Sequence, residues 1–257
     1  MSSNQPQRGG PQQIPRPARW ATGGRPTWEE AAPALTIDRI ASVFEGRAGE
    51  SSPVETTGGS PSAVLVAIYP DGREDQGNES LSVLLTRRSD TLRHHTGEVS
   101  FPGGRTDPGE TAVEAAIREA YEEVALDPSL VRPLGELDHL TTVTRRAYIV
   151  PIVAVLDERP ELHPAEAEVA AILHVSLAEL MNPDVFREER WGMAPQDRPV
   201  YFFELLGDTV WGATAAMLRQ FLLLAMDLDP GPRESWDPAG AGDQIWEPSP
   251  GSGPLPF

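Results

Sequence analysis

Apolar residues recur at the spacing of an α-helix in three stretches of the chain. One begins after Thr36, a residue type that caps helix N-termini, and another covers Thr214–Met226. The third begins after Thr111, where Thr-x-x-Glu forms a capping box with Glu114. A helical turn is also predicted over Ser176–Met181. The apolar faces of the three helices consist of Ile37, Ile40, Ala41 and Phe44; of Val113, Ala116, Ile117, Ala120, Tyr121 and Val124; and of Leu218, Phe221, Leu222 and Ala225.

Short apolar runs between turn residues predict β-strands. The run Ala63–Tyr69 predicts a buried strand that ends at the turn residues 70–72, and Pro151 suggests an edge position or a bulge for its own strand. Strands and helices interleave without a repeat, which suits an α/β fold with a mixed β-sheet between helices. The other predicted strands are Ser82–Thr86, Glu98–Phe101, Arg132–Leu140, Ala147–Leu156, Val169–Val175 and Val200–Leu205.

The two ends of the chain differ in composition from its centre. Residues 1–33 are rich in proline, glutamine and glycine and carry no acidic residue before position 27, so they are predicted to form a disordered basic arm. Residues 228–257 contain seven prolines and are predicted to form a disordered tail. A single folded domain is therefore expected over residues 34–227.

Composition excludes several kinds of chemistry. The chain has no cysteine and no lysine, since all 21 basic residues are arginine, so thiolate, Schiff-base and P-loop lysine sites are impossible. A net charge of −18 argues against broad binding to nucleic acid. No apolar run approaches the roughly 18 residues that span a bilayer, and no hydrophobic leader follows the N-terminal arginines. We expect a cytoplasmic protein that does not bind membranes.

The helix that begins after Thr111 places three carboxylates on one face, at Glu119, Glu122 and Glu123. Like charges at i,i+3 and i,i+4 destabilise an isolated helix by a few tenths of a kcal/mol per pair. A solvated acidic surface is the ordinary explanation of such a face. The alternative is a hard divalent cation, Mg²⁺ or Mn²⁺, which takes oxygen ligands and shares them with substrate phosphates.

The spacing around these carboxylates resembles the Nudix box, G-x5-E-x7-R-E-U-x-E-E-x-G-U, in which U is a bulky apolar residue. Gly104, Glu110, Arg118, Glu119, Glu122 and Glu123 fill its first glycine position and all its charged positions. Two positions differ: Ala120 is small for an apolar U position, and Ala125 replaces the last glycine. That glycine is expected to end the helix in a left-handed conformation, so alanine should either cost about 1 kcal/mol or shift the cap, without removing a ligand.

The Nudix resemblance implies a mixed sheet between helices and an enzyme that hydrolyses diphosphate bonds with Mg²⁺ or Mn²⁺. Glu119, Glu122 and Glu123 are the implied metal ligands, with the carbonyl group of Gly103. Arg118 is expected to pair with Glu110 and to fix the preceding loop to the helix. The general base stays open among Glu119, Glu168 and the nearby Glu166. A homodimer is possible.

A second pattern precedes the box and resembles the coenzyme A diphosphatase branch of the family, LLTxRSxxxRxxxGxxxFPGG. Residues 84–104 match every fixed position, although Glu98 stands where members often have glutamine. The sequence Trp-Gly-Ala-Thr at 211–214 is also similar to this branch. One guanidinium group can donate two parallel hydrogen bonds to phosphate oxygens, which suits a diphosphate substrate. The candidate substrate-binding residues are Arg87, Arg88, Ser89, Arg93, His95, Gly97, Phe101 and Gly104, with His94 in the same basic cluster.

Three functions remain open from the sequence. The first is metal-dependent hydrolysis of coenzyme A or an acylated form of it, to 3′,5′-adenosine diphosphate and 4′-phosphopantetheine. The second is hydrolysis of another small nucleotide substrate, such as ADP-ribose, NADH or an oxidised nucleotide, because the box builds only the diphosphate site. The third is a non-catalytic module that binds a nucleotide, although such a module need not keep every carboxylate.

Overall fold

The computed structural model describes residues 8–12, 14–29, 34–52, 61–75, 78–89, 97–142, 147–192 and 197–231. Its helices are α1 (Ile37–Phe44), α2 (Ala112–Val124), α3 (Leu177–Met181) and α4 (Gly212–Ala225), with a 3₁₀ turn at Pro128–Leu130. The predicted caps are confirmed: Thr36 accepts a hydrogen bond from the Arg39 N–H, and Thr111 and Glu114 form the capping box of α2.

Eight strands form the larger sheet: β2 (Pro61–Asp75), β3 (Asn78–Arg88), β4 (Val99–Ser100), β5 (Gly103–Arg105), β6 (Arg132–Glu136), β7 (Leu140–Thr141), β8 (Tyr148–Val155) and β9 (Val169–Ser176). Its main order is β4-β3-β2-β8-β6, while β5 pairs with β2, β7 with β8 and β9 with β3. β2 and β8 are parallel and the other pairs are antiparallel, which confirms a mixed sheet.

Four short strands form a second, antiparallel sheet, in the order β1-β10-β11-β12. The sequence analysis predicted only one of them, β11. Of the other three, β1 and β12 are only three residues long, and β10 carries arginine and glutamate between its aromatic residues, so none shows a clear strand pattern. Their bounds are β1 (Trp20–Thr22), β10 (Phe186–Trp191), β11 (Arg198–Glu204) and β12 (Thr209–Trp211).

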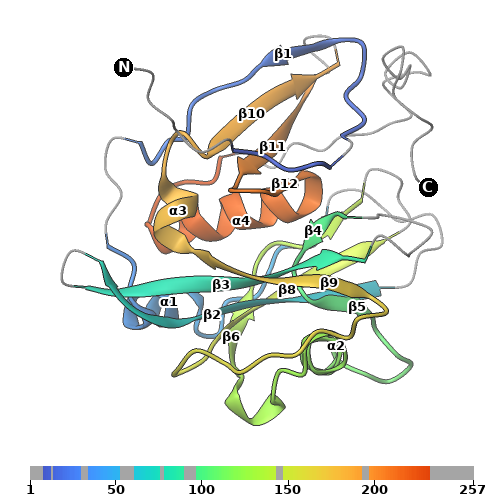
Figure 1. Cartoon of the computed structure of the whole chain (residues 1–257), viewed down its shortest axis with the longest axis vertical. Helices are drawn as coiled ribbons and strands as arrows, with labels where there is room; N and C mark the ends of the chain where they lie inside the picture. Colours follow the sequence, from blue (N-terminus) through green and yellow to red (C-terminus); the bar gives the residue numbers. More distant parts are fainter. Residues whose placement is uncertain are drawn as a thin grey trace.

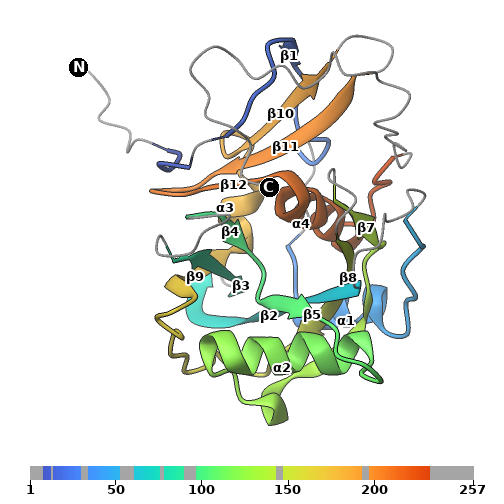
Figure 2. The ribbon, with the colours of Figure 1, turned by 90° about the vertical axis from the view of Figure 1, so that its right-hand side faces the viewer.

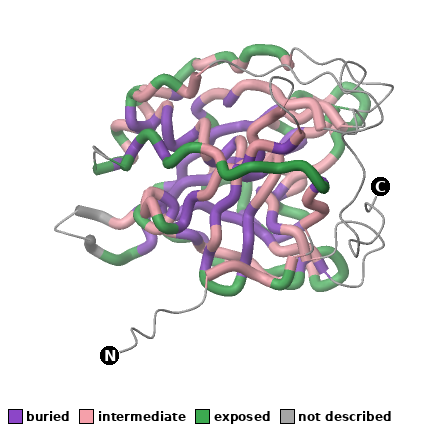
Figure 3. Tube along the Cα trace, turned by 90° about the horizontal axis from the view of Figure 1, so that it is seen from above, coloured by how far each residue is buried: buried purple, intermediate pink, exposed green. Residues whose placement is uncertain are grey.

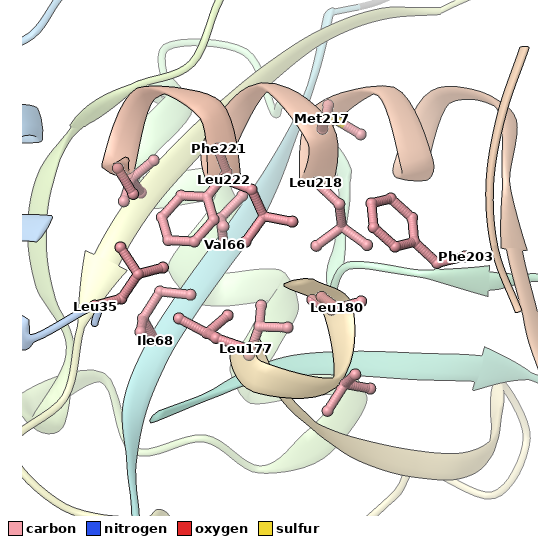
Figure 4. Close-up of a cluster of buried hydrophobic side chains, with 14 of the residues drawn as sticks. Leu35, Val66, Ile68, Leu177, Leu180, Phe203, Met217, Leu218, Phe221 and Leu222 are labelled. Atoms are coloured by element: carbon pink, nitrogen blue, oxygen red, sulfur yellow. The ribbon is translucent and has the colours of Figure 1, made fainter. Parts of the chain in front are cut away.

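The elements stack in layers, with α2 on one face of the larger sheet and α4 between the two sheets (Figures 1 and 2). The α2 core lies between α2 and the sheet and includes Leu65, Leu84, Ala116, Ala120 and Ile152. The α4 core lies on the other face, where α4, α3 and β2 bring their apolar side chains together (Figure 4). It includes Val66, Ile68, Leu177, Leu180, Phe203, Leu218, Phe221 and Leu222. Seen from above, buried positions lie inside the trace and exposed ones lie mainly in outer segments (Figure 3).

The prediction of a disordered arm over residues 1–33 is wrong for the described part of that segment. Trp20–Thr22 forms an antiparallel edge strand against Glu189–Trp191. Trp28 is only 1% exposed, packs edge-on to Phe186 with ring centroids 5.0 Å apart, and donates its indole N–H to the Met181 carbonyl. The composition is typical of a flexible segment, but the aromatic side chains supply enough apolar area to fix it. Residues 232–257 of the predicted tail lie outside the described part.

Two strand predictions also change. β2 continues through the predicted turn at 70–72 with a register shift between Pro70 and Glu74, so the turn residues form a bulge inside a long hairpin. The strand expected over Arg132–Leu140 divides into β6 and β7. Pro151 lies in an internal strand, where its missing N–H falls between the stretches of β8 that pair with β6 and β7. In the described part, no helix has both the length and the apolar character needed to cross a bilayer.

Ala125 ends α2 in the left-handed conformation that the sequence analysis expected, with φ 56° and ψ 30°. Its N–H reaches the carbonyl groups of Ala120 and Tyr121. Glycine adopts this conformation without steric cost, so Ala125→Gly should raise the free energy of unfolding by about 1 kcal/mol. In a protein of this size, that corresponds to a rise in melting temperature of about 2–4 °C. Ala41→Gly, inside α1, should instead lower stability by about 1 kcal/mol, and thermal unfolding of both variants tests the sign.

Candidate active site

Two glycines bring β5 against the acidic face of α2. A side chain on Gly104 would overlap the carboxylate of Glu119, and one on Gly103 would come within 2.6 Å of the Val64 Cα in β2. The Gly103 N–H also donates to Glu123 Oε2 at 3.3 Å. The Gly-Gly pair therefore fits between strand β2 and the acidic face, where a larger residue would clash with β2 at position 103 or with Glu119 at position 104.

Glu123 is the most enclosed carboxylate of this face, with 6% of its surface exposed. Burial raises its pKa to about 7, an effect that the Gly103 N–H and the Arg88 guanidinium oppose and that Glu119 and Glu168 reinforce. Burial also raises the pKa of Glu119, against the influence of Arg118. Two desolvated carboxylates lie together here, an arrangement that a cation would stabilise.

Arg118 pairs with Glu110 as the sequence predicted, through Nε–Oε1 and Nη2–Oε2 distances of 2.8 and 3.0 Å. It makes two further contacts that were not predicted, to Glu119 Oε1 at 3.0 Å and to Glu122 Oε2 at 3.2 Å. The i,i+4 spacing of Arg118 and Glu122 was a usable signal for the second of them. The same guanidinium donates to the Arg105 carbonyl and so joins the loop, β5 and α2.

The donor set of this face suits Mg²⁺ or Mn²⁺, because every candidate ligand is an oxygen atom. Among the described residues, no three His, Cys, Asp or Glu side chains are already gathered for a metal ion. Arg118 instead pairs with both Glu119 and Glu122. A cation would therefore compete with Arg118 for these carboxylates, while the buried charge of Glu123 would attract it.

Gly104→Ala should separate activity from stability. The new methyl group would push the Glu119 carboxylate aside, and a displacement of about 1 Å in an active site costs up to about 10²-fold in rate. We expect kcat/KM to fall by about 10-fold or more, with little change in melting temperature, because only the end of a flexible side chain must move. Gly24→Ala is the matched control, since a methyl group there meets no atom within 4 Å. Full activity in Gly104→Ala would show that Glu119 does not need this position.

Glu168 lies close enough to influence both Glu119 and Glu123 electrostatically. It is exposed and directly precedes β9, and its carbonyl accepts a hydrogen bond from the Ser89 N–H at 2.8 Å. The Ala165 N–H donates to the Glu123 carbonyl, which holds the segment before β9 against the end of α2. This position brings Glu168 to the carboxylate cluster, whereas no such influence on the cluster is found for Glu166.

The neighbouring arginines of β3 point to opposite faces of the sheet. Leu84 packs in the α2 core and Leu85 in the α4 core, and this alternation continues to the end of the strand. Arg88 influences Glu123 electrostatically, and its Nε is buried with no hydrogen-bond partner in the described part of the chain. Arg87 instead holds Asp208, with Nη1 at 3.1 and 3.2 Å from the two carboxylate oxygens.

The remaining candidate substrate residues separate into three groups. Phe101 is 2% exposed and packs in the α4 core, and its contact with substrate stays a prediction. Ser89 is buried beside Glu168, and Gly97 has φ 70° and donates its N–H to the Arg88 carbonyl. Arg93, His94 and His95 lie outside the described residues.

The family of the chain is decided by comparison with known domains. A profile described as the NUDIX domain matches residues 59–200, more than half of the chain. The chain belongs to the Nudix family. The match includes β2, both glycines, α2 and the segment that carries Glu168.

Similar proteins include Nudix hydrolases of other bacteria. A protein of Photorhabdus laumondii named uncharacterized Nudix hydrolase NudL is 40% identical over 141 residues, which cover 54% of this chain and 74% of the relative. A protein of the same name from Cronobacter sakazakii is 33% identical over 190 residues, covering 74% of this chain and 94% of the relative. Among solved structures, the Nudix hydrolase RenU of M. smegmatis has a TM-score of 0.40 at 23% identity, over 49% of this chain and 74% of that one. This protein is therefore a Nudix hydrolase, a class of enzymes that acts on nucleoside diphosphate derivatives.

Proposed function

We propose that this Nudix hydrolase cleaves the diphosphate bond of coenzyme A, giving 3′,5′-adenosine diphosphate and 4′-phosphopantetheine. The observation that carries the proposal is the position of Arg88. It belongs to the pattern that resembles the coenzyme A diphosphatases, and its buried Nε has no partner among the described residues. A guanidinium group held beside the carboxylate face is suited to bind a diphosphate oxygen. The rest of the pattern, over residues 84–104, ends at the two glycines of the site.

The proposed metal ligands are Glu119, Glu122 and Glu123, with the Gly103 carbonyl. When bound, Mg²⁺ or Mn²⁺ supplies positive charge that neutralises the diphosphate and makes a water molecule more acidic. For Glu119 and Glu122 to hold a cation, Arg118 would have to give up its contacts with them, and its pair with Glu110 would keep it in place. Gly103 and Gly104 leave room for the diphosphate to approach the backbone.

In the reaction, a water molecule attacks one phosphorus atom, the bond from that phosphorus to the bridging oxygen breaks, and the bridging oxygen leaves with the other phosphate. Glu168 is the residue that we assign to accept the proton of this water, because it is exposed and its charge acts on both Glu119 and Glu123. Arg88 stays bound to the diphosphate and offsets the charge that develops on its oxygens.

Product analysis by chromatography tests the proposal. The purified protein is incubated with coenzyme A, an acyl-coenzyme A, ADP-ribose, NADH and 8-oxo-dGTP, each with Mg²⁺, with Mn²⁺ and with a chelator. We expect metal-dependent formation of 3′,5′-adenosine diphosphate from coenzyme A, faster than turnover of the nucleotides. Faster hydrolysis of ADP-ribose, NADH or 8-oxo-dGTP would overturn the coenzyme A substrate and keep the metal site. No turnover of any of them would favour a binding module.

A further inference from the structure

The N-terminal segment 8–12 lies outside the matched NUDIX domain, yet it is bound along the β11–β12 turn (Figure 2). The Gly9 N–H donates to the Leu205 carbonyl at 2.7 Å, and the Gly10 N–H donates to Thr209 Oγ1 at 3.0 Å. The approach is close: a side chain on Gly10 would come within 2.6 Å of the Asp208 Cα. This segment is therefore packed directly against the turn that carries Asp208.

Gln12 connects this segment to the end of the substrate-binding pattern. Its Nε2 donates to the Gly97 carbonyl and to Asp208 Oδ1, both at 3.0 Å, and its Oε1 accepts the Thr209 N–H at 2.9 Å. The amide thus bridges three parts of the chain that are distant in sequence. Alanine at this position would leave the Gly97 carbonyl and the Thr209 N–H without these contacts.

Two of the three partners of the Gln12 amide, Gly97 and Asp208, contact the neighbouring arginines of β3. The Gly97 N–H donates to the Arg88 carbonyl at 3.2 Å, and Asp208 binds the Arg87 guanidinium. Asp208 is only 5% exposed, so its charge is balanced mainly by Arg87 and by the Gln12 amide. Gln12 therefore helps to fix the backbone of Arg88 from one side and the side chain of Arg87 from the other.

We propose that Gln12 is a positioning residue for substrate binding. The N-terminal segment 8–12 therefore contributes to the function of the enzyme as well as to its fold. Gln12 acts through Gly97 and Asp208, which hold the end of β3 so that Arg88 meets the diphosphate. The inference rests on the proposed role of Arg88 as a substrate contact. It predicts that loss of the Gln12 amide weakens substrate binding and leaves the metal-dependent chemical step unchanged.

The test compares Gln12→Ala and Gln12→Glu with a matched control, Gln220→Ala, in the full-length protein. Gln220 makes the same kind of bridge between other parts of the chain, since its amide, on α4, donates to Asp138 Oδ2 and accepts the Asp138 N–H. Two measurements are made on each variant: KM and kcat for the preferred diphosphate substrate, and hydrogen exchange of the amides from Gly97 to Ser100.

For Gln12→Ala we expect KM to rise roughly 5- to 10-fold with kcat within about twofold, as the loss of one to two net hydrogen bonds implies. Exchange at Gly97–Ser100 should become faster. Gln12→Glu should raise KM further, because its carboxylate would face Asp208. Gln220→Ala should change neither quantity. An unchanged KM in Gln12→Ala overturns the proposal, whether or not exchange becomes faster, and so does an equal rise in Gln220→Ala.

The outcomes also separate this inference from the proposed function. If another diphosphate compound replaces coenzyme A as substrate, KM is measured on that compound. The change of this KM in Gln12→Ala then decides the role of Gln12 independently of the coenzyme A proposal. If the wild type turns over none of the substrates, the proposed function fails, and the substrate role of Gln12 fails with it. Faster exchange in Gln12→Ala would then still establish the link to Gly97, and unchanged exchange would refute it.

Discussion

Glu123→Gln should abolish most of the diphosphatase activity while the protein stays folded. We expect kcat to fall by about 10³-fold or more, since a ligand carboxylate of a catalytic cation stabilises the transition state by several kcal/mol. Glutamine has the same shape and can still accept the Gly103 N–H. Because it removes a buried charge, the melting temperature of the metal-free variant should not fall. Steady-state kinetics with Mg²⁺ and Mn²⁺, together with thermal unfolding in chelator, measure both effects.

Glu114→Gln provides the control for this change. Glu114 lies on the same helix as Glu123, and the substitution is again glutamate to glutamine. The Glu114 side chain, however, belongs to the capping box, in which glutamine can take the place of glutamate. The activity of Glu114→Gln should stay within about twofold of the wild type. Retained turnover in Glu123→Gln would contradict the metal site on α2, and equal losses in both variants would point to a general effect on the helix.

Trp28→Ala should produce the largest loss of stability among the variants considered. The side chain is 1% exposed, contacts Phe186 and Phe203, and donates to the Met181 carbonyl. Replacing a buried tryptophan by alanine costs about 3–5 kcal/mol through lost burial and the cavity that remains. Denaturant unfolding would show this as a lower midpoint with an unchanged slope.

Trp20→Ala is the matched control from the same N-terminal segment. Trp20 is 44% exposed at the edge strand β1, so its removal should cost at most about 1 kcal/mol. A small loss in Trp28→Ala, similar to that of Trp20→Ala, would mean that the N-terminal segment contributes little to the fold. It would then support the disordered arm that composition alone predicted.

The sequence by itself determined the acidic helix, its caps and the pairing of Arg118 with Glu110. These features depend on residues close together in the chain: the helix period places the carboxylates on one face, and the spacing of the Nudix box implied the pair of Arg118 with Glu110. The left-handed end at Ala125 followed in the same way from one position of a known pattern. Local spacing was also enough to identify the glycines that lie against Glu119 and Glu123.

Only the tertiary structure decided what lies around this helix. Strand alternation and the packing of α4 separate Arg88, which faces Glu123, from Arg87, which binds Asp208. The same packing buries Phe101, and residues of the N-terminal segment join the fold through Trp28 and Gln12. The hydrogen bonds of Arg87, Trp28 and Gln12 join residues that are far apart in the chain, and their partners are set by how the layers stack. No local pattern of polar and apolar residues contains that information, so composition gave the wrong prediction for the segment that holds the end of β3.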